Sequence, residues 1–252
     1  MCPIKSSVTK PKTKTKSTSK KKNMKKSKEV AEEIEKSEED LAALEQALSQ
    51  QIAMMENKAQ DQGPRFRSIS LYGNIDEEIA NDVIFSMMAL KEYGKREFLE
   101  GDIEDPENAK VYTFYEPFDL TISTFGGSAA DMFAIYDTIR MIRKDCGVHT
   151  FGLGKVMSAG VLLLASGTKG KRRIGKNCRV MIHSVVGGSA GQLHDLENEM
   201  EEMRWIQEKH IECLVKETDM TKAYLKKLLN RKVNVYLTAD EAVELGIADE
   251  VI

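Results

Sequence analysis

The stretch Gly152–His183, with the sequence GLGKVMSAGVLLLASGTKGKRRIGKNCRVMIH, decides how the rest of the chain is interpreted. Ser158 stands among small residues at the start of the apolar run Val161–Leu164, and His183 ends a second apolar run. A serine at the beginning of a helix lies in the partial positive charge of the helix N-terminus, which favours a nearby oxyanion. A histidine at the end of a buried strand is held in place by its own backbone. The two residues therefore suggest a nucleophile and its general base.

The same residues also fit a structural interpretation, because serine is a preferred N-cap and a lone histidine after a strand often only packs. A third element favours catalysis. The segment Thr124–Ser128, with the sequence TFGGS, follows the strand-like Asp119–Ser123. A Gly-Gly pair after a strand allows the close backbone approach that an oxyanion hole requires.

Several further segments occur in an order and spacing that match one known family. They are Phe125–Gly127 followed by Ala134–Thr138, Gly154–Gly160, Ala165–Arg172, Arg179–His183, Gly187-Gly188 and Tyr236–Gly246. With these segments, residues of about 69–252 resemble the proteolytic subunit of the Clp protease, a family of serine peptidases. The resemblance implies an α/β fold, the ββα spiral shared with the crotonases, with a long projecting "handle" helix.

The resemblance also implies roles for individual residues. Ser158 matches the nucleophile, His183 the general base, and the backbone N–H groups of Gly127 and Ala159 the oxyanion hole. Asn234 stands where the family has the aspartate of the triad. Asparagine can orient the imidazole but cannot stabilise the imidazolium by charge, and such a swap in a serine protease costs on the order of 10⁴ in rate. The resemblance therefore predicts the site, while Asn234 places its activity in question.

The function implied by the resemblance is endopeptidase cleavage of protein substrates inside a homo-oligomer, stacked heptameric rings in the family, fed by an AAA+ unfoldase. Three other hypotheses remain open. The protein could be a viral head-maturation protease that processes capsid or scaffold, a non-catalytic ring subunit in which Asn234 reflects lost activity, or a crotonase acting on acyl-CoA. A crotonase has no need of a Ser158/His183 pair, so the pair disfavours that class.

The amino-acid composition is typical of a protein with a single globular domain and a hydrophobic core. The 252 residues are 41% hydrophobic and 31% charged, with a net charge of −3. The four cysteines show no CxxC spacing, so neither a zinc site nor a redox motif is indicated, and we expect no metal and no cofactor. No run approaches the roughly 20 apolar residues that a membrane span needs. These features predict a cytoplasmic protein that does not enter a membrane.

The N-terminal part differs from the rest. Residues 1–28 are rich in lysine, serine and threonine without aromatic residues, which predicts a disordered basic tail rather than a nucleic-acid-binding arm. Residues 29–63 are acidic with apolar residues at three/four spacing, which predicts an amphipathic helix and a linker ending at Gly63-Pro64. The peptidase-like domain is then expected over residues 64–252.

Within that domain the pattern predicts a strand at 68–72, a helix at 75–90, and from residue 120 strands alternating with helices, as in βαβ units. Residues 94–117 are charged and poor in apolar runs and are expected to form a long connection, with an acidic solvated loop at 100–107 and a short hairpin near Val111-Tyr112 as the alternative. A helix is predicted from Gln192 to about Glu217. The charged run 169–173 is interpreted as a solvated turn, and His149, His194 and His210 as structural.

Overall fold

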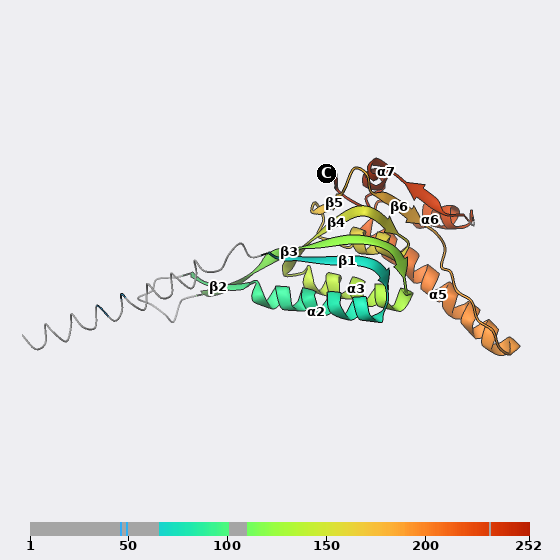
Figure 1. The fold of residues 1–252 in the computed structure, drawn as a ribbon, viewed down its shortest axis with the longest axis horizontal. Helices are drawn as coiled ribbons and strands as arrows, with labels where there is room; N and C mark the ends of the chain where they lie inside the picture. The colour runs from blue at the N-terminus through green and yellow to red at the C-terminus, as the bar shows by residue number, and fades with distance from the viewer. Residues whose placement is uncertain (1–45, 47–48, 50–65, 101–109, 232) are drawn as a thin grey trace, which may run out of the picture. The chain divides into compact units, whose positions relative to one another are not determined.

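A sheet built around parallel strands forms the centre of residues 66–252 (Figure 1). The computed structural model describes residues 46, 49, 66–100, 110–231 and 233–252. Phe66–Ile252 forms one compact unit. The sequence predictions for residues 1–28 and 29–63 lie outside the described residues, apart from two isolated positions.

The strands within the described residues belong to one sheet. Their bounds are β1 Ser68–Ile75, β2 Lys95–Glu100, β3 Lys110–Gly127, β4 Cys146–Met157, β5 Arg172–Ile174, β6 Arg179–Ile182, β7 Val235–Leu237 and β8 Glu250–Val251. The main path runs β1-β3-β4-β5-β8, and every pair along it is parallel. Strand β6 pairs with the second half of β4 in parallel, and β7 pairs with β6 antiparallel. The mixed α/β architecture predicted from the sequence is therefore confirmed.

Helices α2 (Glu77–Tyr93) and α3 (Ala129–Ile142) pack against one another and lie along one side of the sheet in Figure 1. Each begins at a polar N-cap, Asp76 and Ser128, whose side chain accepts a hydrogen bond from the third helical N–H. The short helix α4 (Ala159–Ala165) is buried along its whole length. Its burial explains why the sequence shows an uninterrupted apolar run there rather than an amphipathic stripe.

Helix α5 (Leu193–Glu217) confirms the long helix that the sequence predicts, and it extends away from the sheet in Figure 1. Its last residue, Glu217, is 1% exposed and anchors the helix. Both guanidinium Nη atoms of Arg143 donate to the Glu217 carboxylate at 2.8 Å, and the Tyr136 hydroxyl donates to it at 3.0 Å. Burial raises the pKa of Tyr136, so its hydroxyl remains a neutral donor.

The C-terminal part closes the sheet with small elements. Thr221 is the N-cap of helix α6 (Lys222–Leu229). Helix α7 (Ala239–Glu244) has Thr238 as its N-cap, which forms a capping box with Glu241. Both helices bury an apolar side against the core.

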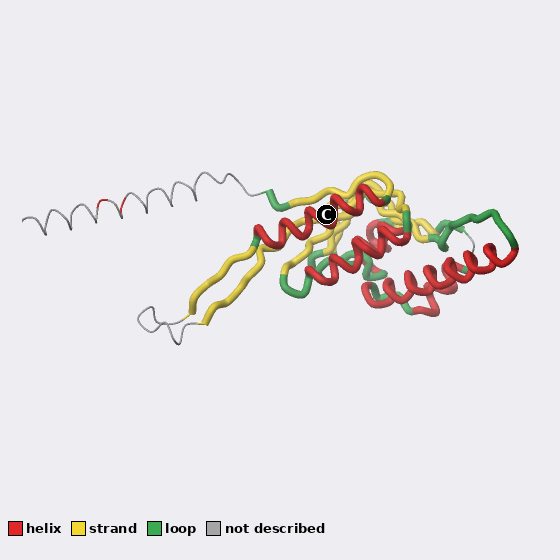
Figure 2. The backbone as a smooth tube through the Cα atoms, turned by 90° about the horizontal axis from the view of Figure 1, so that it is seen from below, coloured by secondary structure: helices red, strands yellow, loops and turns green. Residues whose placement is uncertain are grey.

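Two predictions made from the sequence need correction. Residues 95–100 and 110–115 form an antiparallel hairpin, longer than the short one expected near Val111, with Lys95 opposite Tyr115 and Glu100 opposite Lys110 (Figure 2). The loop expected at 100–107 lies outside the described residues apart from Glu100. The charged run 169–173 is not wholly solvated either. Arg172 is buried, donates from Nε to Asp249 at 2.9 Å, and donates from Nη1 to the Glu217 carbonyl at 2.7 Å. The run thus supplies a buried cation that joins β5 to the end of α5.

Candidate active site

Ser158 occupies a sharp turn between the end of β4 and the start of α4. Its φ of 54° is the only positive value among the non-glycine residues that the structure describes. Its side chain makes no capping hydrogen bond to the helix that follows. A strained backbone of this kind typically costs about 1–3 kcal/mol and persists only where the surrounding structure imposes it. The turn therefore presents the Ser158 hydroxyl outward, in contrast to an ordinary N-cap.

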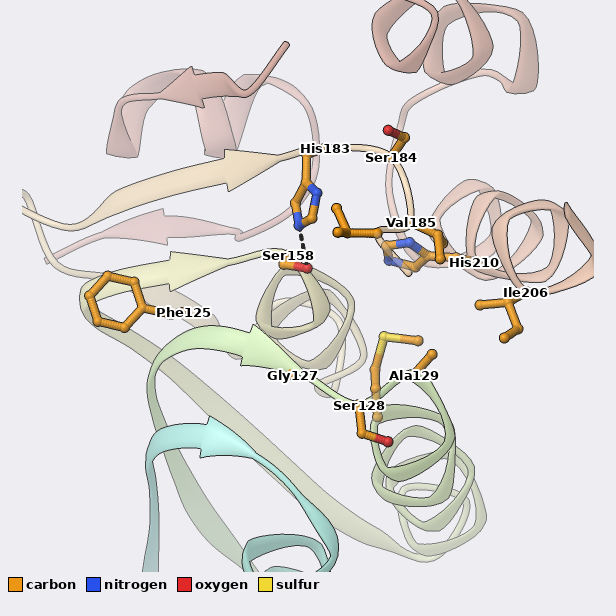
Figure 3. A pocket seen from close by; sticks show the side chains of 12 residues that line it. Phe125, Gly127, Ser128, Ala129, Ser158, His183, Ser184, Val185, Ile206 and His210 are labelled. Carbon is orange, nitrogen blue, oxygen red and sulfur yellow. Dashed lines mark hydrogen bonds between the residues drawn. The ribbon is translucent and has the colours of Figure 1, made fainter. Parts of the chain in front are cut away.

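His183 follows β6, and the pairing of β6 with β4 brings it next to Ser158 (Figure 3). Val156 pairs with Val180 and Met157 with Met181 in this parallel ladder. The Ser158 N–H donates to the Met181 carbonyl at 2.8 Å, which extends the pairing to the turn. The Nε2 atom of His183 lies 2.7 Å from the Ser158 Oγ. The two candidate residues are thus brought within hydrogen-bond distance.

The Gly126-Gly127 turn at the end of β3 lies against the same place. A Cβ at Gly126 would meet the Ser158 Cβ at 2.6 Å, and one at Gly127 would meet the Ile75 carbonyl oxygen at 2.0 Å. Only glycine allows these approaches. The buried Thr124 hydroxyl holds the turn by donating to the Gly73 carbonyl at 2.6 Å and accepting from the Gly126 N–H at 2.9 Å.

Two backbone amides are candidates for stabilising an oxyanion. Gly127 lines the same cavity as Ser158. Ala159 is the first residue of α4, and the N–H at this position has no acceptor within its own helix. Backbone donors close to an attacked carbonyl are the usual components of an oxyanion hole.

Asn234 is not joined to this pair in the structure. It directly precedes β7, whose last ladder pair with β6 is Val235 opposite Ile182. One further step in this register sets residue 234 opposite His183, and opposite residues point their side chains to the same face. However, Asn234 is exposed, and among the described residues it makes no hydrogen bond to His183. The backbone register matches the expected third position, while the side-chain contact is not formed.

A cavity of about 310 Å³ opens beside the Ser158–His183 pair (Figure 3). Residues from the Gly-Gly turn, the start of α3, the segment after His183 and the inner side of α5 line it. They are Phe125, Gly127, Ser128, Ala129, Met132, Ser158, His183, Ser184, Val185, Val186, Ile206 and His210. None of them carries a carboxylate. The cavity is large enough for an amino-acid side chain, since one water occupies about 30 Å³.

His210, interpreted from the sequence as structural, belongs to the wall of this cavity. It is 9% exposed, and its Nε2 is the one buried side-chain nitrogen or oxygen without a hydrogen-bond partner among the described residues. Burial, with a smaller contribution from the nearby His183, lowers its pKa to about 4. An unpartnered buried polar group costs about 1–3 kcal/mol. The signal available in the sequence was a polar residue on the otherwise apolar stripe of α5.

Metal-ligand clusters and thiols are the other reactive groups to consider among the described residues. These residues contain no group of three or more His, Cys, Asp or Glu side chains placed to hold a metal ion. Cys146 and Cys178 are buried thiols, and burial raises the pKa of Cys178 to about 11, so it is a poor nucleophile at neutral pH. No helix in the part of the chain that the structure describes combines the length and the apolar character needed to cross a membrane.

Comparison with known families agrees with this geometry. The family model described as Clp protease matches residues 113–252, which include most of β3 and every later element, with Ser158, His183, Asn234 and His210 among them. The match covers more than half of the 252 residues. Because it includes both the strand that ends in Gly127 and the strands that bring Ser158 to His183, the chain belongs to the Clp protease family, a family of peptidases.

Proposed function

We propose that the protein is a serine endopeptidase that hydrolyses peptide bonds with Ser158 as nucleophile and His183 as general base. The observation that supports this proposal most directly is the 2.7 Å separation of His183 Nε2 and Ser158 Oγ at the mouth of a cavity. A strained, outward-facing serine beside a histidine is the arrangement that nucleophilic acyl transfer requires.

The reaction follows from the positions of these groups. His183 Nε2 takes the proton of the Ser158 hydroxyl while Oγ bonds to the scissile carbonyl carbon. The carbonyl oxygen gains a negative charge, which the N–H groups of Gly127 and Ala159 stabilise. The C–N bond then breaks as His183 gives its proton to the leaving amine. A water molecule, deprotonated by His183, hydrolyses the acyl-enzyme and restores the Ser158 hydroxyl.

The test is covalent labelling with a fluorophosphonate, followed by mass spectrometry of the labelled peptide. We expect labelling at Ser158 that is abolished in Ser158→Ala and reduced at least about 100-fold in His183→Ala, because the hydroxyl then lacks its base. Ser184→Ala is the matched control, because Ser184 lines the same cavity without the histidine contact. Absence of labelling in a folded, assembled wild-type protein would remove the peptidase proposal for this chain on its own.

A second candidate function is that of a slow or inactive ring subunit. The observation that favours it is Asn234, an uncharged and exposed residue that makes no hydrogen bond to His183 among the described residues. In this case fluorophosphonate labels Ser158 slowly or not at all, while the protein still assembles and binds a partner.

Assembly into rings, and delivery of protein substrates by an AAA+ unfoldase, form part of the proposal. Exposed large apolar residues on α5, Leu193 at 73% and Trp205 at 53%, support burial of this helix against other copies, in the role of the family's handle. Phe85 and Tyr93 on α2 are exposed as well and border a separate groove. We expect Trp205→Glu to weaken assembly in analytical ultracentrifugation, whereas the charge-preserving Arg204→Lys leaves it unchanged.

A further inference from the structure

Helix α5 forms one wall of the cavity beside Ser158. His210 lines this cavity, and its Nε2 has no hydrogen-bond partner within the described residues. Buried polar groups in folded proteins are nearly always paired, so an exception next to a reactive centre calls for a reason. A partner that arrives with the substrate is such a reason.

The other residues that line the cavity indicate which kind of side chain this partner has. Val185 and Ile206 line the space with apolar surface (Figure 3), and Met132 belongs to the same lining. No lining residue is acidic, so the cavity offers nothing to neutralise a lysine or arginine side chain. A carboxylate is equally disfavoured, because His210 has a pKa of about 4 and is neutral at physiological pH. A purely apolar side chain would fill the space but would leave the imidazole unpaired.

We propose that His210 is a specificity-determining residue, and that the cavity receives a substrate side chain ending in a carboxamide, that of glutamine or asparagine, from the residue whose carbonyl Ser158 attacks. This inference rests on the proposed peptidase function. A neutral imidazole has one N–H donor and one acceptor nitrogen, and a carboxamide has both a donor and an acceptor, so it pairs with either tautomer. The cavity adjoins both Ser158 and Gly127, which is where the side chain of the attacked residue must enter.

The segment that covers this space is suited to admit a side chain. Val185 and Val186 lie between β6 and α5, in a stretch without regular secondary structure. Sites built to hydrogen-bond a polar substrate group discriminate strongly against analogues that lack it, because the protein group is then left unpaired. Discrimination should therefore appear between glutamine and its near-isostere methionine.

The experiment compares fluorogenic peptides that differ only in glutamine or methionine before the cleaved bond, using the full-length assembled protein. We expect the wild type to favour glutamine by about 10-fold or more in kcat/KM, as expected when a buried group is left unpaired. His210→Leu should lower this ratio about 10- to 100-fold, and His210→Gln, which keeps a donor and an acceptor, should retain most of it. A methionine preference in the wild type, or one ratio shared by all three proteins, overturns the assignment.

A binding measurement separates this inference from the peptidase proposal. In the Ser158→Ala background, which cannot perform the chemistry, calorimetry measures the affinity of acetylated peptides that end in glutamine or methionine. A preference for glutamine that disappears in Ser158→Ala/His210→Leu supports the role of His210, even where fluorophosphonate labelling of the wild type fails. Equal affinities for the two peptides overturn it, even where Ser158 proves to be the nucleophile.

Discussion

Restoring a carboxylate opposite His183 is the sharpest perturbation of the proposed site. The β6–β7 register carries residue 234 to the position across from His183, one step beyond the pair Ile182 and Val235. Asn234→Asp replaces the side-chain NH2 group by a single oxygen and adds one negative charge. It should stabilise the imidazolium that forms when His183 takes the Ser158 proton.

The size of the gain follows from the exposure of residue 234. Asn234 is exposed, so the effective dielectric constant lies between that of a protein surface and that of water. For charges about 4 Å apart, this range corresponds to about 1–4 kcal/mol. At about 1.4 kcal/mol per tenfold change, the acylation rate should rise by roughly 5- to 1,000-fold.

The assay is the second-order rate constant for fluorophosphonate labelling of Ser158 in the wild type and in Asn234→Asp. Asn230→Asp is the matched control, because it adds the same charge four residues earlier, at the C-cap of α6. Labelling of Asn234→Asp at the wild-type rate would refute the argument that the ladder register orients residue 234 toward the imidazole. An equal gain in Asn230→Asp would show that net charge, and not position, is responsible.

Three further predictions concern stability. Glu217→Ala leaves the partly buried Arg143 without its carboxylate, which typically costs about 3–5 kcal/mol of folding stability. The thermal midpoint measured by calorimetry should fall by roughly 6–20 °C, and Glu217→Gln should lower it less. Ser158→Gly should be about 1–3 kcal/mol more stable than Ser158→Ala in urea unfolding, because glycine accepts the positive φ; equal stabilities would contradict the strained turn. His210 has a folded pKa of about 4 against 6.5 when unfolded, so the unfolded state binds the extra proton between these values and stability falls as pH drops from 7 to 4. At about 1.4 kcal/mol per unit, the wild type should lose up to about 3 kcal/mol relative to His210→Leu over this window, and parallel pH profiles would count against a buried neutral imidazole.

The sequence was sufficient for the framework of the site because its residues lie in segments with strong local patterns. Apolar runs bounded by Gly126-Gly127, Ser158 and His183 predict buried strands that end at the same edge, and the parallel pairing of β4 with β6 brings the two side chains together. The hairpin of β2 and β3 was expected only as a short alternative near Val111, because the large side chains of its described part are exposed. Phe98, Tyr112 and Phe114 are exposed, so no alternation of buried and polar residues indicates strands.

Two other features depend on tertiary structure that no local pattern encodes. Whether the Asn234 side chain reaches His183 is decided by its rotamer and its solvation, while the sequence indicates only its register. The environment of His210 arises where α5 crosses the segment after β6, far from His210 along the chain. Only the packed structure reveals that His210 lines a cavity and that its Nε2 has no hydrogen-bond partner within the described residues.

The ladder that positions residue 234 is short. Strands β6 and β7 share three residue pairs, and β7 has no second neighbour in the sheet. Edge elements with few backbone hydrogen bonds open at a small fraction of the global unfolding free energy. The amide hydrogens of Val235 and Leu237 should therefore exchange with solvent faster than those in the middle of β3 and β4. Local opening of β7 would thus remove residue 234 from its place opposite His183, while the Ser158–His183 pair stays joined through the β4–β6 ladder.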